Sequence, residues 1–205
     1  MPQDTAQLKQ YTEFMQHLTV DGRVIPWIDM DSTPSTMEIA HAIVRDGRRE
    51  TTLISANCQT SGRGTKGRSW SSLPGKGVWL SVILPPPDDL DNLSGLTVAV
   101  AEELIRTLRL YADCPFTIKD PNDVLVNGRK IAGILVETSI VADDVRSVLL
   151  GMGMNFTQTR EDFLRDNLPD ATSLILENGT VPSREEFIKT FMTFLLKRYD
   201  IMIRS

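Results

Sequence analysis

The chain has 205 residues, of which 41% are hydrophobic and 24% are charged. This composition is that of a globular protein, and it excludes disordered, collagen-like and coiled-coil chains. Because 22 Lys and Arg stand against 27 Asp and Glu, the net charge is −5, and we expect no nucleic-acid partner. The polar start and the lack of an apolar run of about 20 residues predict a cytoplasmic protein that contacts no membrane.

Residues 1–25 are predicted to form a helical extension ahead of the main domain. Over residues 4–19, apolar side chains recur at helical spacing, at Leu8, Tyr11, Phe14, Met15 and Leu18. The dipeptide Asp21-Gly22, followed by Pro26, is expected to end this helix. One helix is too little for a helix-turn-helix module, so we expect no DNA-binding domain here.

The rest of the chain mixes predicted strands and helices. Runs of apolar and β-branched residues predict strands at 27–30, 51–56, 78–84, 116–118 and 147–151. Amphipathic spacing and end signals predict helices from Thr33-Pro34 to Gly47, over Leu93 to Leu110, and after a Ser183–Glu186 capping box.

The clearest local signal is a β-hairpin. Residues 124–126 and 129–137 read as strands, and Asn127-Gly128 between them favours the turn that matches strand twist. Together with the other elements, this hairpin predicts an α+β domain. Its mixed or antiparallel sheet carries helices packed on it, and a Rossmann fold is excluded.

Gln59 to Trp70 is a loop rich in glycines and cations. Its glycines alternate with Arg63, Lys66 and Arg68. Glycine lets backbone N–H groups approach an anion closely, and the cations add charge-assisted hydrogen bonds. The loop therefore suits a phosphate or acyl phosphate, although its spacing is that of neither a P-loop nor a dinucleotide fingerprint. A solvated basic loop is the alternative.

Three further segments carry residues suited to a site. Residues 119–123 place an amide and a carboxylate before the hairpin, where an ordinary turn is the alternative. Lys130 opens an apolar strand, and period-two alternation predicts that it shares a face with Ala132 and Ile134. That lysine either extends to the sheet edge or reaches into a site. Residues 151–155 combine glycines and an asparagine at a strand end.

Taken in order, these segments resemble the catalytic domain of biotin–protein ligases, in the biotin and lipoate protein ligase superfamily. The matching segments are 31–33, 59–70, 119–123, 128–137 and 151–155, and the resemblance covers roughly residues 26–200. It implies one catalytic domain over residues 1–205 with the class II synthetase-like fold. We expect neither an N-terminal helix-turn-helix domain nor the small C-terminal SH3-like domain of this family.

The resemblance implies an ATP-dependent ligase with Mg²⁺ as cofactor. Biotin would be activated as biotinyl-5′-AMP and then passed to a lysine of a biotin carboxyl carrier protein. Homodimerisation through sheet edges is compatible with the resemblance. The alternatives are a lipoate or octanoate ligase or transferase, and a non-catalytic biotin-binding paralogue. The paralogue is suggested by Asp120, Thr65 and the missing C-terminal domain, which depart from the family pattern.

The resemblance also implies the roles of individual residues. The expected catalytic residues are Lys130 and Arg63. The expected biotin-binding residues are Ser32, Thr33, Gln59, Gly62, Arg63, Gly64, Thr65, Lys130 and Gly133. The expected ATP-binding residues are Arg63, Arg68, Trp70, Lys119, Asn122, Asp123, Lys130 and Asn155, and Asp123 is the expected Mg²⁺ ligand.

Overall fold

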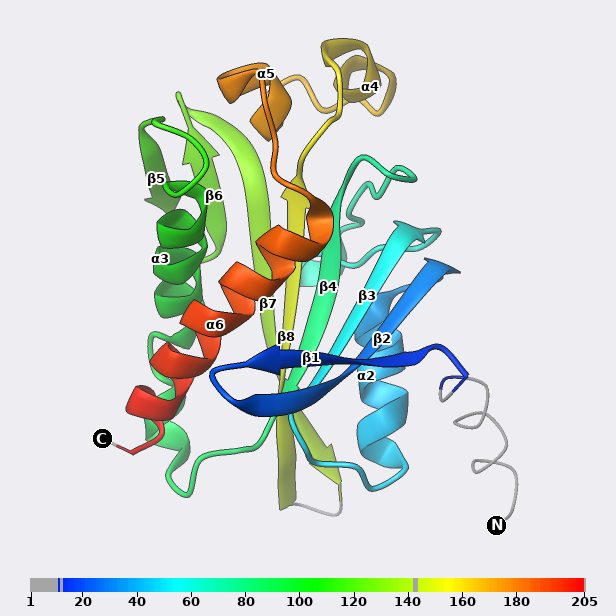
Figure 1. Ribbon diagram of the computed structural model, residues 1–205, viewed down its shortest axis with the longest axis vertical. Helices are drawn as coiled ribbons and strands as arrows, with labels where there is room; N and C mark the ends of the chain where they lie inside the picture. The colour runs from blue at the N-terminus through cyan, green and yellow to red at the C-terminus, as the bar shows by residue number, and fades with distance from the viewer. Residues whose placement is uncertain (1–10, 12, 142–143, 205) are drawn as a thin grey trace.

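The computed structural model describes residue 11, residues 13–141 and residues 144–204, which form a mixed β-sheet with helices on both faces (Figure 1). The strands are β1 (Met15–Val20), β2 (Arg23–Thr33), β3 (Thr52–Gln59), β4 (Gly77–Leu84), β5 (Phe116–Lys119), β6 (Asp123–Val126), β7 (Arg129–Val141) and β8 (Asp144–Asn155). Their order is β1-β2-β3-β4-β8-β7-β6-β5. Within the described ranges only β2 and β3 pair in parallel. The predicted α+β class with a mixed sheet is confirmed.

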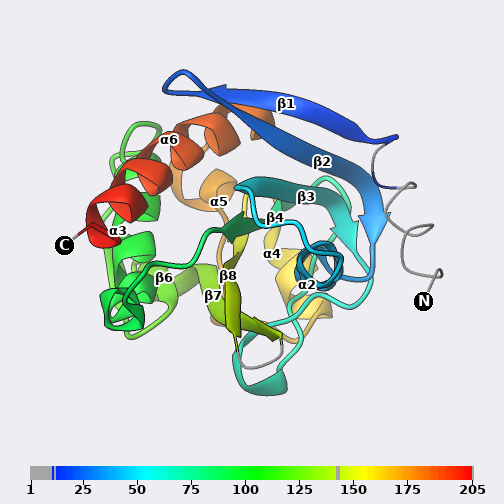
Figure 2. The ribbon, with the colours of Figure 1, turned by 90° about the horizontal axis from the view of Figure 1, so that it is seen from below.

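The helices divide between the faces and one end of this sheet. They are α2 (Thr36–Arg45), α3 (Leu96–Leu108), α4 (Arg160–Arg165), α5 (Leu174–Asn178) and α6 (Arg184–Met202), with short 3₁₀ turns at Thr65–Gly67 and Leu90–Leu93. Helices α3 and α6 lie on one face and α2 on the other, as Figure 2 shows from below. Helices α4 and α5 sit beyond the upper end of the sheet in Figure 1. No helix in the described part of the chain is long and apolar enough to cross a membrane.

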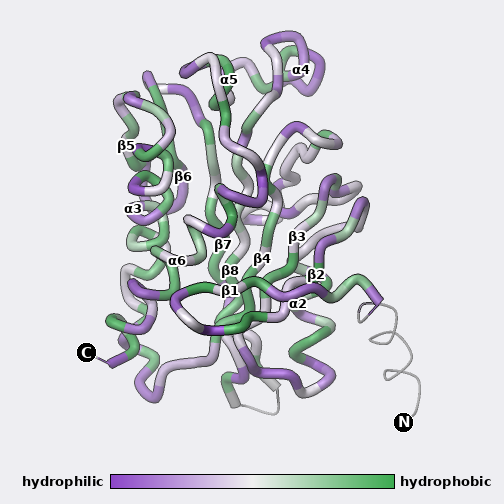
Figure 3. The backbone as a smooth tube through the Cα atoms, in the orientation of Figure 1, coloured by the Kyte–Doolittle hydropathy of each residue, from purple (hydrophilic) through white to green (hydrophobic). Residues whose placement is uncertain are grey.

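Alternating side chains of the strands fill two separate hydrophobic layers. Leu53, Val82 and Leu150 face α3 and α6, whereas their neighbours Ile54 and Leu149 pack against α2. This is the two-sided burial expected of central strands covered on both faces. Figure 3 shows hydrophobic segments gathered along the central strands, with hydrophilic segments towards the loops.

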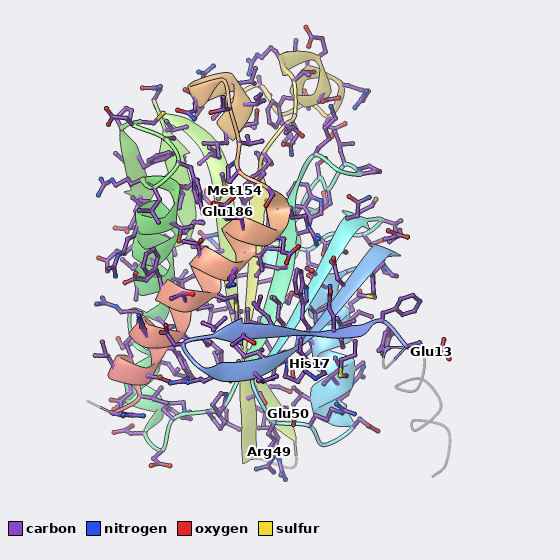
Figure 4. All side chains as sticks on the ribbon, viewed as in Figure 1. Glu13, His17, Arg49, Glu50, Met154 and Glu186 are labelled. Atoms are coloured by element: carbon purple, nitrogen blue, oxygen red, sulfur yellow. The ribbon has the colours of Figure 1, made fainter. Side chains whose placement is uncertain are left out.

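The predicted helix over residues 4–19 is wrong from Met15 onward, because Met15–Val20 is strand β1. The part of the predicted helix at residues 4–10 and 12 lies outside the described residues. His17, which was also expected on a helix, lies on β1 (Figure 4). Asp21 and Gly22, with φ of 47° and 75°, form the tight turn from β1 to β2. Pro26 does not break an element, since it lies within β2 opposite His17. An Asp-Gly pair ends a helix or turns a hairpin equally well, and here sheet pairing decides.

Most of the other predicted elements are present with shifted ends. The Asn127-Gly128 hairpin is confirmed, with φ of 51° and 76° at its two turn residues. Helix α6 begins after Ser183, whose Oγ accepts the Glu186 N–H. The short helices α4 and α5 were not predicted, although α4 opens with a capping box between Thr159 and Asp162.

Candidate active site

A cavity of about 320 Å³ lies between the α2 face of the sheet, the glycine-rich loop and the α4 segment. It collects most of the residues that the sequence indicated. The predicted residues that line it are Gln59, Arg63, Gly64, Thr65, Arg68, Trp70, Asn122, Asp123, Lys130, Gly133 and Asn155. Segments from both halves of the chain therefore meet at one concave surface, as expected of a ligand site.

The floor of the cavity is made by two paired glycines on adjacent strands. Gly133 on β7 pairs with Gly153 on β8. The indole of Trp70 lies directly over both, because a Cβ atom would lie 2.6 Å from Trp70 Cζ3 at Gly133 and 2.4 Å from Trp70 Cε2 at Gly153. Neither position can carry a side chain without moving this ring. The missing side chains thus let an aromatic ring lie flat on the sheet.

Lys130 reaches this floor because of a β-bulge. Val124 pairs with Ala132 but Leu125 pairs with Lys130, so Ile131 is an extra residue in β7. The prediction that Lys130 shares a face with Ala132 and Ile134 is therefore wrong. Those two side chains pack in the α3 and α6 layer, as does Ile131, whereas Lys130 turns toward the cavity. Bulges commonly redirect a side chain in this way beside a site.

The ammonium group of Lys130 has two partners at the cavity. Its Nζ lies 2.6 Å from Asp123 Oδ1 and 5.0 Å from the centre of the Trp70 ring. The carboxylate and the aromatic face both attract the ammonium group and restrict where it points. Lys130 is thus a fixed cation over the glycine floor and not a lysine extended into solvent.

The glycine-rich loop is itself a small closed hairpin. The Gly64 N–H donates to Arg68 O at 2.8 Å, and the Trp70 N–H donates to Gly62 O at 2.8 Å. Thr65, one of the residues that depart from the pattern of the resemblance, accepts a bond from Arg68 Nη2 at 2.9 Å through its Oγ1. The threonine therefore orients a neighbouring cation instead of supplying one.

Arg63 projects from this loop toward β7. Its Nη2 lies 3.7 Å from Glu137 Oε1, and Glu137 Oε2 lies 2.7 Å from His41 Nε2 on α2. The guanidinium is 45% exposed, so its contact with Glu137 is weak and an anionic ligand can compete for it. Arg63 thus stands at the rim of the cavity as an available cation.

The first turn of α2 supplies polar groups that the sequence analysis missed. Ser35 and Thr36 line the cavity, whereas the predicted Ser32 is exposed and Thr33 is buried, and neither belongs to the described lining. Gln59 Oε1 accepts the Thr36 N–H at 2.9 Å. The chain carries two Ser-Thr pairs three residues apart, and the second one falls at the helix start.

The far end of the cavity is built around Asn155 and the segment that follows it. Asn155 Nδ2 donates to Thr172 O at 3.0 Å, and Gln158 Nε2 donates to Asn155 Oδ1 at 2.9 Å. This end was only partly predicted, since Gln158, the α4 residues Asp162 and Phe163, and Asp166 just after α4 also line it. The Thr159 N–H, then the charge of Lys76, hold the pKa of Asp162 below its usual value.

Besides Ser32 and Thr33, two more predicted ligand residues lie outside this surface. Lys119 is exposed and Gly62 is buried, and both fall outside the described lining. A Cβ atom at Gly62 would lie 2.5 Å from Trp70 O, so this glycine allows the loop to close. Asp120 is exposed next to Lys119, which keeps its carboxylate away from the cavity.

Several buried polar atoms at the cavity have no hydrogen-bond partner among the described residues. They are Ser35 Oγ, Trp70 Nε1 and Gln158 Oε1. Buried polar atoms are almost always paired, so unpaired ones beside a cavity indicate a polar ligand. The described residues contain no cluster of three or more metal-binding side chains. The single carboxylate of Asp123 is enough for a magnesium ion that takes its other ligands from phosphates and water.

Comparisons with known proteins place this geometry in a family context. Residues 30–155 match the model of the biotin/lipoate A/B protein ligase family. The bifunctional ligase/repressor BirA of Bacillus spizizenii is 39% identical over 173 residues, which is 84% of this chain and 53% of that protein. The biotin–[acetyl-CoA-carboxylase] ligase of Mycobacterium tuberculosis is 33% identical over 150 residues, covering 71% of this chain and 53% of that protein. The chain thus spans about half the length of these curated relatives.

A solved structure is similar over most of the fold. Biotin protein ligase from Aquifex aeolicus, in complex with biotin and ATP, superposes with a TM-score of 0.74 and 26% sequence identity. The match covers 87% of this chain and 72% of that chain.

Proposed function

Because this chain belongs to the biotin/lipoate A/B protein ligase family, we propose that it is a biotin–protein ligase that uses ATP to join biotin to protein. The observation that carries the proposal is the placement of Lys130 over the glycine floor, with Arg63 at the rim of the same cavity. A structurally similar relative was solved with biotin and ATP, which supports both as substrates. The proposed setting is the cytoplasm.

In the first proposed step, a carboxylate oxygen of biotin attacks the α-phosphorus of ATP. The bond to the β-phosphate oxygen breaks, and pyrophosphate leaves with the electron pair. Negative charge grows on the phosphate oxygens, and Lys130, Arg63 and the loop N–H groups are suited to stabilise it. One fixed donor of this kind lowers the activation free energy by about 3–4 kcal/mol. Bound Mg²⁺, held through Asp123 and the phosphates, would add further neutralising charge.

The proposed ligand contacts follow the cavity lining. Biotin is assigned to Gln59, Gly64, Thr65 and Gly133, with Ser35 and Thr36 in place of Ser32 and Thr33. The nucleotide is assigned to Arg68, Trp70, Asn122 and Asn155, and to the α4 segment. These groups would hold the two substrates in contact, and such proximity lowers the activation free energy by up to about 7–11 kcal/mol.

In the second proposed step, a lysine amine of a carrier protein attacks the acyl carbon of the adenylate. An amide bond forms, AMP leaves, and the amine loses a proton. The names of two relatives refer to acetyl-CoA carboxylase, and this supports a biotin carboxyl carrier protein as partner. A homodimer formed through a sheet edge stays a prediction.

A lipoate or octanoate ligase is the second candidate, because the matching family model includes lipoate enzymes. The names of the curated relatives favour biotin. A biotin-binding paralogue without catalysis is the third candidate. Retained Lys130 and Arg63 at one cavity oppose it.

The deciding measurement is ATP–pyrophosphate exchange with Mg²⁺ and, in separate samples, biotin, lipoate or octanoate. We expect exchange with biotin alone. Lys130→Ala should lower it at least about 100-fold, since a fixed cation at the developing charge is removed. Lys189→Ala, which removes an exposed lysine of α6, is the matched control and should exchange normally. Exchange with lipoate or octanoate instead would move the protein to the second candidate. A folded sample that binds biotin without exchange would favour the third.

A further inference from the structure

We propose that Glu177 is a positioning residue for this reaction, acting by fixing the strand end that carries Lys130. Glu177 lies in α5 and does not belong to the described cavity lining, so it cannot act on a ligand directly. The identity of the reaction rests on the proposed function. The role of Glu177 rests on the hydrogen bonds around it.

Lys130 lies where β7 extends past its neighbour β8. Pairing with β8 begins at Ala132, opposite Met154. Before that point a loop segment takes the place of a strand, because the Lys130 N–H donates to Asp170 O and the Thr172 N–H donates to Lys130 O, both at 2.9 Å. The position of the Lys130 backbone therefore depends on the position of this loop segment.

One carboxylate ties that segment to the hairpin. Glu177 Oε1 accepts bonds from Thr172 Oγ1 at 2.5 Å and from Arg129 Nη2 at 2.7 Å. Its Oε2 accepts a bond from Asn127 Nδ2 at 2.8 Å. The Glu177 side chain is 4% exposed, so its carboxylate is held inside the protein while its partners reach it from outside. Glu177 thus joins both chain segments that flank Lys130.

Glu177 is in turn held to the body of the sheet. The Ile175 N–H donates to Phe156 O at 2.9 Å, directly after β8. The Ser173 hydroxyl donates to Gln158 O at 2.6 Å. The carboxylate is therefore a fixed point against which the Lys130 strand end is set. Misplacing a reacting group by about 1 Å costs roughly 100-fold in rate, so a change here should reach the chemistry.

The test is Glu177→Gln in the whole chain, which keeps the size of the side chain and removes its charge. We expect kcat for biotin-dependent exchange to fall about tenfold to 100-fold, while the Kd for biotin measured by calorimetry stays within about twofold. Glu102→Gln is the matched control, because Glu102 pairs with Arg198 at 3.0 Å on the far helical face. It should leave both quantities unchanged. Thr172→Val removes a single bond to Glu177 and replaces E177Q if that variant does not fold.

A folded E177Q with normal kcat would overturn the positioning role, and so would a loss confined to biotin affinity. Hydrogen exchange of the Lys130 amide supplies a readout that does not depend on activity. It should be faster in E177Q and unchanged in E102Q. If the wild-type protein does not exchange pyrophosphate, the proposed function fails. The Lys130 amide then decides the positioning role by itself, since unchanged protection in E177Q would overturn it.

Discussion

A single hydrogen atom at Gly153 determines whether Trp70 can lie on the sheet. The Cβ of an alanine would overlap the indole at 2.4 Å, and the ring is packed edge-on against Trp79 with centroids 6.5 Å apart. Relieving the overlap therefore requires the ring to move away from the sheet. Its position also fixes one side of the Lys130 ammonium group.

We expect Gly153→Ala to displace Trp70 and to change the tryptophan fluorescence of a protein that still folds. Biotin-dependent exchange should fall at least about tenfold, because the floor of the cavity is lost. Gly64→Ala is the structural control, since its Cβ would come no closer than 3.4 Å to Arg68 O. Fluorescence that responds equally to both substitutions would contradict this account.

At the level of residues, most of the predicted site residues line one cavity, but their geometry was not predictable. Lys130, Arg63 and Gly133 were assigned to the site through the family resemblance, and all three line the cavity. Ser32 and Thr33 were assigned through the same resemblance, whereas Ser35 and Thr36, which line the cavity, were not considered. Gln158 carries no motif at all, and only the fold brings it to the cavity.

Among the elements, the β1–β2 hairpin depends on the backbone at Gly22. Its φ of 75° lies in the left-handed region, and no other atom lies within 4 Å of the position a Cβ would occupy. We therefore expect Gly22→Ala to lower the free energy of unfolding by about 1–2 kcal/mol through backbone strain alone. Urea unfolding measures this loss. Gly22→Asn should cost less, because asparagine tolerates this conformation, and an equal cost for both would argue against strain.

A difference between the sequences that flank the two hairpin turns explains why only one hairpin was predicted. Asn127-Gly128 stands between strongly apolar strands, so only a hairpin satisfies the local pattern. Asp21-Gly22 follows a segment whose apolar residues fit a period of either two or 3.6. In the structure Leu18 and Val20 are buried and Thr19 is exposed, which is strand alternation over too short a run to recognise.

Across the whole molecule, α6 joins distant parts of the chain. Arg184 at its start donates two bonds to Asp29 on β2, at 3.0 and 2.9 Å. Near its other end, the Tyr199 hydroxyl donates to Pro85 O at 2.5 Å, just after β4. The sequence predicted this helix and its apolar face, but the partners lie more than 100 residues away and leave no local signal.

Burial raises the pKa of Tyr199 far above its ordinary value. The unfolded chain therefore loses this proton first, near pH 10, and the phenolate then favours unfolding. The stabilisation from the buried neutral phenol is fully present below pH 10. Above pH 10 the free energy of unfolding should fall by about 1.4 kcal/mol per pH unit. Tyr199→Phe should lack this component of the alkaline slope. Its free energy of unfolding at neutral pH should be about 1–3 kcal/mol lower, because the bond to Pro85 O is lost. An unchanged slope in denaturant titrations of Y199F would refute the assignment.

The extra residue in β7 has a consequence for how this sequence tolerates length changes. Odd and even positions along a strand point to opposite sides, so the number of residues between Lys130 and Gly133 selects the side that receives the ammonium group. A chain that lost only Ile131 would keep the lysine and both glycines of the floor. Lys130 would then lie two residues from Gly133, on the same side of a regular strand, so its ammonium group would still be directed toward the cavity. With Ile131 present the spacing is three residues, and the bulge at Ile131 is what keeps the ammonium group on the cavity side.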